Sequence, residues 1–289
     1  MTESELLAKA EGKRVLFVGE KIIDVYHYVR PLGRPTKDAI VSVELINSEQ
    51  FEGGLIAAKN HAANFCHVSW QASGRILQKE RYIEQSHLHK LFECYRDQGA
   101  SSKPLPNFRD YDCVVVCDYG HGMADSRFIA ALESARYLAI NVQTNSGNYG
   151  FNLATKYRRS GANYLCVDEP EARLATQNRS GPIEDSLEPL SKMLTADKVV
   201  ITLGKNGAIG LCDGDVMHCK AFTDRIVDTM GAGDAFFALS AIVAKEAPME
   251  NLLRIGNAAG AVKSGIVGHR ASVTKAALLA CLESGQCIS

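Results

Sequence analysis

The stretch that decides the fold is Asp228-Thr229-Met230-Gly231-Ala232-Gly233-Asp234-Ala235-Phe236-Phe237. It combines a glycine turn with the start of a helix that is apolar almost all round, as expected of a helix in the core. Gly231 and Gly233 have no side chain that would keep a ligand away from the backbone N–H groups. The first N–H groups of a helix have no partner within it and lie at the positive end of its dipole. The turn therefore suits a phosphate group.

Asp234 lies at the same helix start, where its negative charge would repel a phosphate. It therefore needs a role other than attracting an anion. One such role is to remove the proton from a hydroxyl group that attacks phosphorus. The alternative is an ordinary acidic residue in the first turn of a helix, preceded by a glycine turn that binds nothing.

The composition is that of a globular chain. Of its 289 residues, 46% are hydrophobic, and no low-complexity tract or Pro/Ser-rich linker divides it, so we expect a single domain over residues 1–289. The net charge of −1 does not favour a nucleic-acid or membrane partner. No apolar run is long enough to span a bilayer, and residues 1–12 lack a signal-peptide pattern. The nine scattered cysteines form no Cys-x-x-Cys pair, which indicates a reducing compartment and predicts a cytoplasmic protein.

Short apolar runs alternate with helical patterns along the chain. The runs expected to form buried strands are Arg14–Val18, Asp112–Cys117, Tyr137–Val142, Tyr164–Val167 and Lys198–Leu203. Helical patterns cover Ser126–Ala135, Glu184–Leu194, Asn251–Ser264 and Thr274–Glu283, and an exposed helix is expected around residues 87–89. Continuous apolar strands separated by helices predict a parallel sheet with helices on both faces.

Two segments break this rhythm. Residues 39–45 alternate between polar and apolar side chains, and residues 75–83 do so more weakly. This alternation is typical of half-exposed strands, which we expect outside the main sheet. An ordinary hairpin at the edge of the sheet is the alternative.

Two groups of residues near the N-terminus suit a polyol ligand. Asp24 follows the first strand, where ligands of open α/β sheets bind, and its carboxylate accepts hydrogen bonds from hydroxyl groups. A helix or turn cap is the alternative. Gly53 and Gly54 let the backbone approach a ligand, and Asn60, in the helix of small residues that follows, offers a donor and an acceptor. Close packing of an Ala-rich helix is the alternative for this segment.

Asp168 and Glu171 lie three residues apart across the start of a predicted helix. On one face of that helix they would suit a hydrated Mg²⁺ ion. Carboxylates in a first helical turn are also ordinary partners of the helix dipole, and the spacing alone favours that alternative.

A hairpin and a helix further along would suit a nucleotide. The hairpin contains Thr202, Gly204, Lys205 and Gly207, which bring a hydroxyl, an amine and bare backbone to phosphates and ribose. A plain hairpin turn is the alternative. Asn257 lies among small residues, so a flat group such as adenine could pack against its helix.

The order and spacing of these motifs resemble the PfkB (ribokinase-like) carbohydrate kinases over nearly the whole chain. The resemblance implies a ribokinase-like three-layer αβα sandwich with a mainly parallel sheet. It also implies a small β lid over the substrate, with strands within approximately residues 37–51 and 74–83. In the family's terms, Gly231, Ala232 and Gly233 form the anion hole and Asp234 is the catalytic base.

The resemblance assigns further roles. It implies that Asp24, Gly53, Gly54, Asn60 and Asp118 bind the substrate, and that Thr202, Gly204, Lys205, Gly207 and Asn257 bind ATP. It implies that Asp168 and Glu171 hold Mg²⁺ through water, and it allows a monovalent cation such as K⁺ near Asp228. A homodimer through the lid is also allowed.

Within the family, residues 118–122 (Asp-Tyr-Gly-His-Gly) most resemble a stretch of the bacterial heptose-7-phosphate kinases. Residues 31–35 and 145–148 resemble a related branch found near surface-polysaccharide functions. Two departures stand out. Asp168 replaces the usual Asn of the metal motif, and a strand–helix–strand region that normally borders the sugar site is missing after Val68.

We therefore carry two hypotheses. The first is ATP-dependent phosphorylation of a sugar or sugar-phosphate hydroxyl, in heptose or surface-polysaccharide metabolism. The second, motivated by the missing region, is a catalytically weak sugar- or nucleotide-binding member that acts as a subunit or regulatory module. A nicotinamide-dependent Rossmann dehydrogenase is excluded, because no Gly-x-Gly-x-x-Gly follows the first strand.

Overall fold

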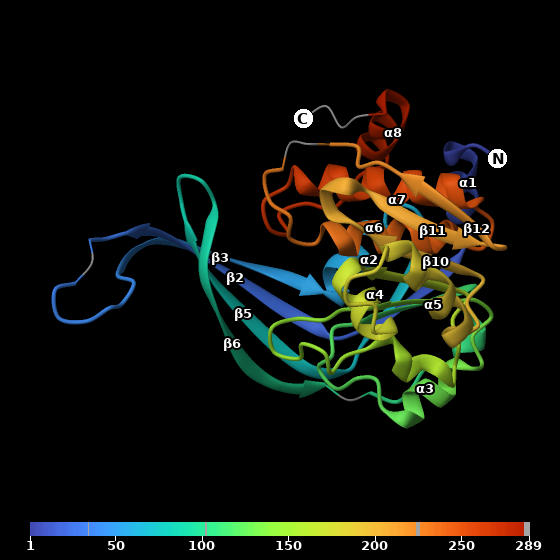
Figure 1. Cartoon of the computed structure of the whole chain (residues 1–289), viewed down its shortest axis with the longest axis horizontal. Helices are drawn as coiled ribbons and strands as arrows, with labels where there is room; N and C mark the ends of the chain where they lie inside the picture. Colours follow the sequence, from blue (N-terminus) through green and yellow to red (C-terminus); the bar gives the residue numbers. More distant parts are fainter. Residues whose placement is uncertain (34, 102, 224–225, 286–289) are drawn as a thin grey trace.

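The computed structural model describes residues 1–33, 35–101, 103–223 and 226–285, and shows a layered body with a smaller sheet extending from one side (Figure 1). The larger sheet has the order β12-β11-β10-β9-β8-β7-β1-β4. Its strands are β1 (Arg14–Gly19), β4 (His67–Ala72), β7 (Cys113–Asp118), β8 (Leu138–Val142), β9 (Tyr164–Asp168), β10 (Lys198–Thr202), β11 (Ala208–Cys212) and β12 (Asp215–Cys219). The strands from β4 to β10 pair in parallel, and β11 and β12 are antiparallel.

Helices cover both faces of this sheet, because its strands are apolar on both sides. Val15 and Phe17 belong to the core on one face, whereas Leu16 and Val18 belong to the core on the other. The first core includes residues of α1 (Glu3–Ala10), α2 (Leu55–Ala62), α6 (Ala232–Val243), α7 (Met249–Ser264) and α8 (Lys275–Ser284). The second includes residues of α3 (Ser126–Leu132), α4 (Glu169–Thr176) and α5 (Leu187–Leu194). The three-layer prediction is confirmed.

Four short 3₁₀ helices lie in the connections between the described elements. They are η1 (Phe108–Asp110), η2 (Ala154–Arg158), η3 (Ile183–Ser186) and η4 (Gly204–Asn206). No helix in the described part of the chain is both long enough and apolar enough to cross a membrane.

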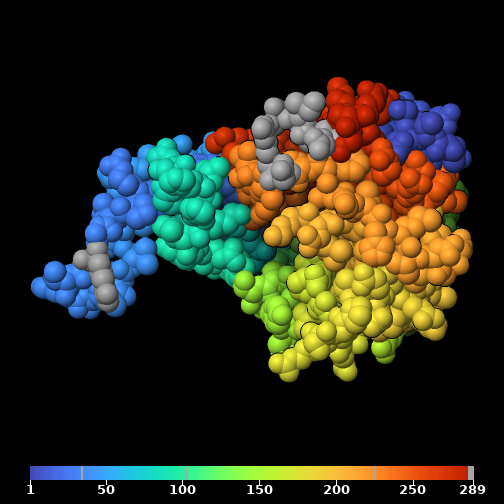
Figure 2. All heavy atoms as spheres, turned by 45° about the horizontal axis from the view of Figure 1, so that its top comes forward, coloured from blue at the N-terminus to red at the C-terminus, as the bar shows by residue number. Residues whose placement is uncertain are grey.

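The smaller sheet has the order β3-β2-β5-β6, with β2 and β5 parallel and the outer pairs antiparallel. Its strands are β2 (Lys21–Pro31), β3 (Val43–Gly54), β5 (Gly74–Glu84) and β6 (His89–Ser101). The far end of β2 and β3 projects from the body as an arm, blue in Figure 2. We call these four strands the lid.

The lid is larger than the sequence pattern predicts. Residues 75–83 lie in β5 as expected, but in the other segment only the residues from Val43 onward form a strand. The helix expected around residues 87–89 is wrong. A turn over residues 85–88 joins β5 to β6, and the Glu84 carboxylate closes it by accepting the N–H groups of Ser86 and His87 at 2.8 and 2.9 Å.

The shortening predicted after residue 68 is visible in the connection between the two sheets. β4 is the last strand of the larger sheet, and Ser73 alone separates it from β5 of the lid. No helix or further strand lies between β4 and β5, a segment that the structure describes throughout. The sheet therefore ends where the family's additional region would begin.

Candidate active site

The glycine turn forms the start of α6, as predicted. Gly231 is the N-cap and has a φ of +74°, a left-handed conformation that favours glycine. A Cβ at this position would lie 2.7 Å from His269 Cε1. The N–H of Ala232 donates to the Thr229 carbonyl at 3.2 Å. The N–H groups of Gly231 and Gly233 have no hydrogen-bond partner among the described residues, so they are available to an anion.

Asp234 is held at this helix start by two side chains from other segments. Its Oδ1 accepts hydrogen bonds from Gln143 Nε2 at 2.7 Å and from the Tyr119 hydroxyl at 3.0 Å. Among the described residues, Oδ2 has no hydrogen-bond donor. Burial raises the pKa of Asp234, although His269 and the two hydrogen bonds oppose this shift. A raised pKa makes the free oxygen a better proton acceptor.

Asp24 lies on β2 close to Asp234 but is already paired. It forms a buried ion pair with Arg81 of β5, and His269 Nε2 lies 3.4 Å from its other oxygen. Burial opposes ionisation, but the hydrogen bond from His269 and the charge of Arg81 hold the pKa of Asp24 below its ordinary value. A sugar hydroxyl would therefore have to share this carboxylate with the Arg81 and His269 side chains.

Gly53 and Gly54 end β3 beside Asp24. A Cβ on Gly53 would overlap Asp24 Oδ2, so this glycine makes room for the carboxylate. Gly54 has a φ of +58° and caps α2. The pair therefore lies at the start of α2, next to the Asp24 carboxylate.

Asn60 and Asp118 are not in contact with the two carboxylates of the candidate site, Asp24 and Asp234. Asn60 is half-buried on α2 and accepts a hydrogen bond from its neighbour Lys59 at 2.7 Å. Asp118 is completely buried at the end of β7 and accepts from Tyr157, at 2.7 Å, and from Lys156. The structure gives neither residue a contact with Asp24 or Asp234.

Asp168 and Glu171 form a capping box at the start of α4. Asp168 accepts the Glu171 N–H at 2.8 Å, and Glu171 accepts the N–H groups of Asp168 and Thr144 at 2.7 and 2.8 Å. Burial and the neighbouring Asp168 charge raise the pKa of Glu171. Asp168 Oδ2 has no donor among the described residues, so it fits a hydrated cation, which would contact it through water.

The predicted nucleotide residues meet at one end of the sheet. The hairpin from Thr202 to Gly207 joins β10 to β11, with Gly204 and Lys205 exposed in η4. A Cβ on Gly207, whose φ is +89°, would overlap the Cys219 carbonyl. Asn257 Nδ2 donates to that same carbonyl at 3.2 Å. The structure therefore brings the hairpin and the helix of Asn257 together at the end of β12.

Asp228, the residue expected near a monovalent cation, is surrounded by donors. Its carboxylate accepts from Tyr26 and from the Gly268 N–H at 2.8 Å each, from the Met230 N–H at 3.1 Å and from Lys90 at 3.3 Å. Burial opposes the shift, but these contacts hold the pKa of Asp228 below its ordinary value.

Several residues around the site are not predicted from the sequence. Glu20 is completely buried and accepts the N–H groups of Tyr119, His121 and Met123 at 2.8, 3.0 and 3.1 Å, which fixes the loop after β7. Burial and the Asp118 charge raise the pKa of Glu20. The sequence offers one indication of this role: Glu20 directly follows the apolar first strand, where a buried charged residue must accept hydrogen bonds from internal donors.

Arg81 and His269 are also missed. Arg81 lies in a segment recognised as a strand, where an inward-facing charge indicates a buried partner. Nothing in the local sequence identifies His269 as the partner of a residue near the other end of the chain. Its Nδ1 atom is buried, and it has no hydrogen-bond partner among the described residues.

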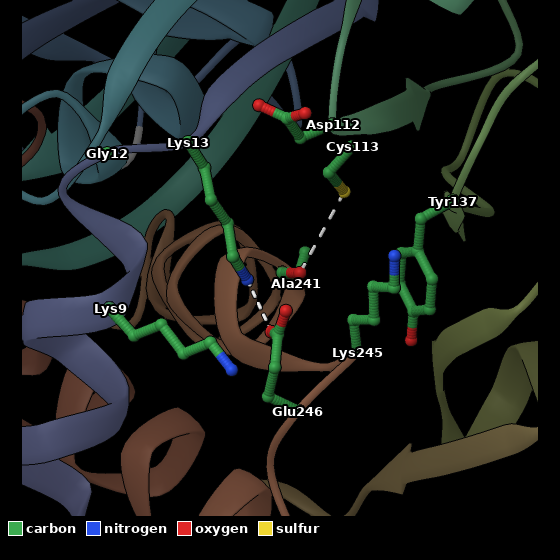
Figure 3. Close-up of a pocket in the computed structure, with 9 residues that line it drawn as sticks. All are labelled: Lys9, Gly12, Lys13, Asp112, Cys113, Tyr137, Ala241, Lys245 and Glu246. Carbon is green, nitrogen blue, oxygen red and sulfur yellow. Dashed lines mark hydrogen bonds and ion pairs between the residues drawn. The ribbon is translucent and has the colours of Figure 1, made fainter.

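Two of the hollows around the larger sheet lie at opposite ends of its strands. One, of about 520 Å³, lies between the lid and the loops after β7 and β8, lined in part by Arg75, Tyr95, His121 and Asn145. The other, of about 330 Å³, lies at the opposite ends of the strands, where Lys13 binds Glu246 and Cys113 faces Ala241 (Figure 3). Only the first is close to the loop that holds Asp234, so we take it as the acceptor side.

The layered fold, the lid and the glycine-lined helix start with its carboxylate define a ribokinase-like α/β protein. A family model described as "pfkB family carbohydrate kinase" matches residues 122–276, which is more than half of the chain. The chain belongs to this family of carbohydrate kinases.

Comparisons with individual proteins agree with this family. The bifunctional protein HldE of Nitrobacter hamburgensis is 30% identical over 180 residues, which cover 60% of this chain and 35% of that protein. The match thus spans about a third of that relative's length. Ribokinase from Thermotoga maritima superposes with a TM-score of 0.72 at 14% identity, over 94% of this chain and 99% of that one. Arabidopsis thaliana ribokinase complexed with ribose and ATP gives 0.70 at 16% identity, with coverages of 94% and 99%.

Proposed function

We propose that this chain transfers the γ-phosphoryl group of ATP to a hydroxyl of a sugar or sugar phosphate. The observation that carries the proposal is the arrangement at the start of α6. There Gln143 and Tyr119 hold one oxygen of Asp234, and its other oxygen has no donor among the described residues. Earlier in the same turn, the N–H groups of Gly231 and Gly233 also have no partner in the described part of the chain. Family membership supports the same reaction class.

In the proposed mechanism, the oxygen of the sugar hydroxyl attacks the γ-phosphorus. Asp234 Oδ2 accepts the proton of this hydroxyl as the new bond forms. The bond from phosphorus to the bridging oxygen then breaks, and ADP leaves. The N–H groups of Gly231 and Gly233 donate to the oxygens of the transferred group. Because such transition states are loose, positioning and charge stabilisation supply most of the rate enhancement.

Nucleotide and metal would lie at the other side of the turn. We propose that Thr202, Gly204, Lys205 and Gly207 contact the phosphates and ribose, and that adenine packs beside Asn257. Asp168 and Glu171 would hold Mg²⁺ through water, and the ion would supply positive charge to the β- and γ-phosphates. The free Asp168 oxygen supports this placement, whereas the capping box shows that Glu171 also has a structural role.

The acceptor hollow favours an anionic sugar. Arg75 lines it and also pairs with Asp97 at 2.9 Å. Lys79 of β5 lies close by, since its charge adds to the effect of burial in lowering the pKa of His121, another lining residue, to about 4. The Lys79 ammonium lies over the Tyr95 ring at 5.5 Å, and the structure gives it no hydrogen-bond acceptor among the described residues. We therefore propose a sugar phosphate as acceptor. The resemblance to the heptose kinases favours a heptose phosphate.

Asp24, Gly53, Gly54 and Asn60 would contact the sugar in this proposal. Asp118 would act indirectly, because it accepts the Gly120 N–H at 2.9 Å and so positions the loop that carries Tyr119. This indirect role is consistent with its complete burial.

One observation favours the second candidate, a catalytically weak binding member. Asp24 is sequestered by Arg81 and His269, and the sheet ends at β4, where a wall of the sugar site would stand. Transfer of ³²P from γ-labelled ATP to a panel of hexoses, pentoses and heptose phosphates separates the two candidates. A labelled sugar product supports the kinase, and ATP binding without any labelled product supports the binding member.

We further propose a cytoplasmic homodimer that pairs through the lid. β6 is an exposed edge strand carrying Leu91 and Phe92, and exposed edges of this kind readily pair with a second chain. Sedimentation equilibrium of the wild type and Phe92→Glu tests this. A monomeric wild type, or a variant that dimerises equally well, would contradict pairing at this edge.

A further inference from the structure

A lysine ammonium group lies buried beneath the glycine turn that begins α6. Lys263, near the end of α7, is completely buried, with 0% of its surface exposed. Its Nζ donates to the carbonyl oxygens of Met230 at 2.6 Å and Ile266 at 3.2 Å. An ammonium group without such acceptors would be strongly disfavoured in the interior. These two carbonyls are therefore what keeps it there.

The position of Lys263 relates it directly to the anion hole. A Cβ on Gly231 would lie 3.4 Å from Lys263 Cε, so the lysine side chain packs against the turn. Burial lowers the pKa of Lys263, and the nearby charges of Asp228 and Asp234 oppose that shift. The positive charge therefore lies close enough to interact with both carboxylates that flank the turn in sequence.

The hydrogen bond to Met230 fixes the direction of an anion-hole N–H group. The Met230 carbonyl and the Gly231 N–H belong to one planar trans peptide unit, in which the two groups point in opposite directions. Because the carbonyl is held toward Lys263, the Gly231 N–H points away from it. That N–H is one of the two that have no partner among the described residues.

The same contacts occupy oxygens that a separate monovalent cation beside Asp228 would need. Backbone carbonyl oxygens are the groups that bind K⁺ in proteins. The carbonyls of Met230 and Ile266 are occupied by Lys263, and Asp228 accepts from Tyr26 and Gly268 instead. The residues present therefore do not fit the K⁺ ion that the family resemblance allows near Asp228.

We propose that Lys263 is a built-in cation and a positioning residue for phosphoryl transfer. Its ammonium group holds the Met230 carbonyl, orients the Gly231 N–H toward the transferred group and makes turnover independent of added monovalent cations. The inference rests on the proposed kinase function, and it extends that function to the ionic requirement of the enzyme.

The test compares turnover in KCl, NH₄Cl and choline chloride at equal ionic strength. The wild type should turn over equally in all three salts. Lys263→Ala should lower kcat about 10²-fold in choline chloride, as expected for a misdirected anion-hole donor. K⁺ or NH₄⁺ should restore at least 10-fold of that loss by entering the space left between the carbonyls, a rescue that a merely structural lysine would not show.

Lys198→Ala is the matched control. Lys198 also donates to two backbone carbonyls, those of Ala244 and Ala247 at 2.6 Å each, but these lie away from the glycine turn. Its removal should leave kcat unchanged in every salt. A wild type that requires K⁺ would overturn the proposal, and so would a folded Lys263→Ala variant with normal turnover or with a loss that neither cation rescues.

A readout without catalysis separates this inference from the kinase proposal. The Tm of Lys263→Ala should be higher in KCl than in choline chloride, because a bound ion stabilises the folded state, whereas the wild-type Tm should be the same in both. If the wild type phosphorylates no sugar, the kinase proposal fails while this Tm pattern still supports the built-in cation. A K⁺-specific rise in the wild-type Tm overturns it whatever the activity.

Discussion

At the scale of single residues, the local motif and its surroundings differ in how far the sequence predicts them. Gly231 and Asp234 were predictable because a glycine turn, a carboxylate and an apolar helix follow one another in the chain. Arg81 was not, because its partner Asp24 lies 57 residues away and only the parallel pairing of β2 with β5 brings them together. The role of Lys263 was hidden for the same reason, since its acceptor Met230 lies 33 residues earlier in the chain, in the loop before α6.

Gly53→Ala should impair use of the acceptor sugar. The added Cβ would overlap Asp24 Oδ2, so the carboxylate must move. A displacement near 1 Å costs on the order of 10²-fold in kcat/KM. Steady-state kinetics with the best acceptor measures the effect, and Gly12→Ala is the control because a Cβ there has no neighbour within 4 Å. Equal kcat/KM for the two variants would show that Asp24 does not bind the sugar.

At the scale of elements, strands buried on both faces were predicted well and the lid was not. β7 and β8 are buried at every residue, so their apolar runs identify them directly. β6 is exposed along nearly its whole length, and its sequence has no apolar period that would reveal a strand. β6 forms a strand because it pairs with β5, and a local sequence pattern does not reveal pairing with a distant segment.

His61 links α2 to the segment before α8 and should make stability depend on pH. Its Nδ1 accepts the Val273 N–H at 3.1 Å, and burial lowers the pKa of His61 to about 3, assisted by Lys263. In the unfolded chain His61 takes up a proton at about pH 6.5, whereas in the folded chain it stays neutral until the pH falls to about 3. The contribution of His61 is therefore fully present above pH 6.5 and lost as the pH falls toward 3.

Urea unfolding at pH 7 and pH 5 measures this dependence. Between these values His61 should account for a loss of about 2 kcal/mol in the free energy of unfolding. His61→Gln keeps an acceptor for Val273 but does not titrate, so its loss should be smaller by about that amount. An identical loss in both proteins would mean that His61 is protonated in the folded state.

At the scale of the whole molecule, the larger sheet is shortened on the side where we propose that the sugar binds. The larger sheet is covered by helices on both faces, but it ends at β4 and passes directly into the lid. This shortening could be predicted, because the strand–helix–strand region that the family has after the position of Val68 is absent from the sequence. The sequence did not predict that Arg81 and His269 would occupy the sugar-side carboxylate, since that depends on how the lid lies against the body.

The shortened sugar side should make ATP the tighter ligand. Asp24 must share its oxygens with Arg81 and His269, whereas Gly204 and Lys205 of the proposed nucleotide hairpin are exposed. Isothermal titration should therefore give a lower Kd for ATP than for any unphosphorylated sugar. Anionic sugar phosphates should bind more tightly than their neutral parents, because Arg75 lines the acceptor hollow and Lys79 lies over Tyr95, another lining residue. Tight binding of a neutral hexose by the isolated chain would refute this account of the missing region.

The most direct measurement of the central claim is single-turnover phosphoryl transfer by the wild type and Asp234→Asn, using ATP and the best acceptor. Loss of the proton-accepting oxygen should lower the transfer rate by about 10²- to 10⁴-fold, while the Kd for ATP stays nearly unchanged. Gln143 and Tyr119 would still hold the side chain, so a large structural change is not expected. A variant that transfers phosphate at a near-normal rate would contradict Asp234 as the base of a sugar kinase.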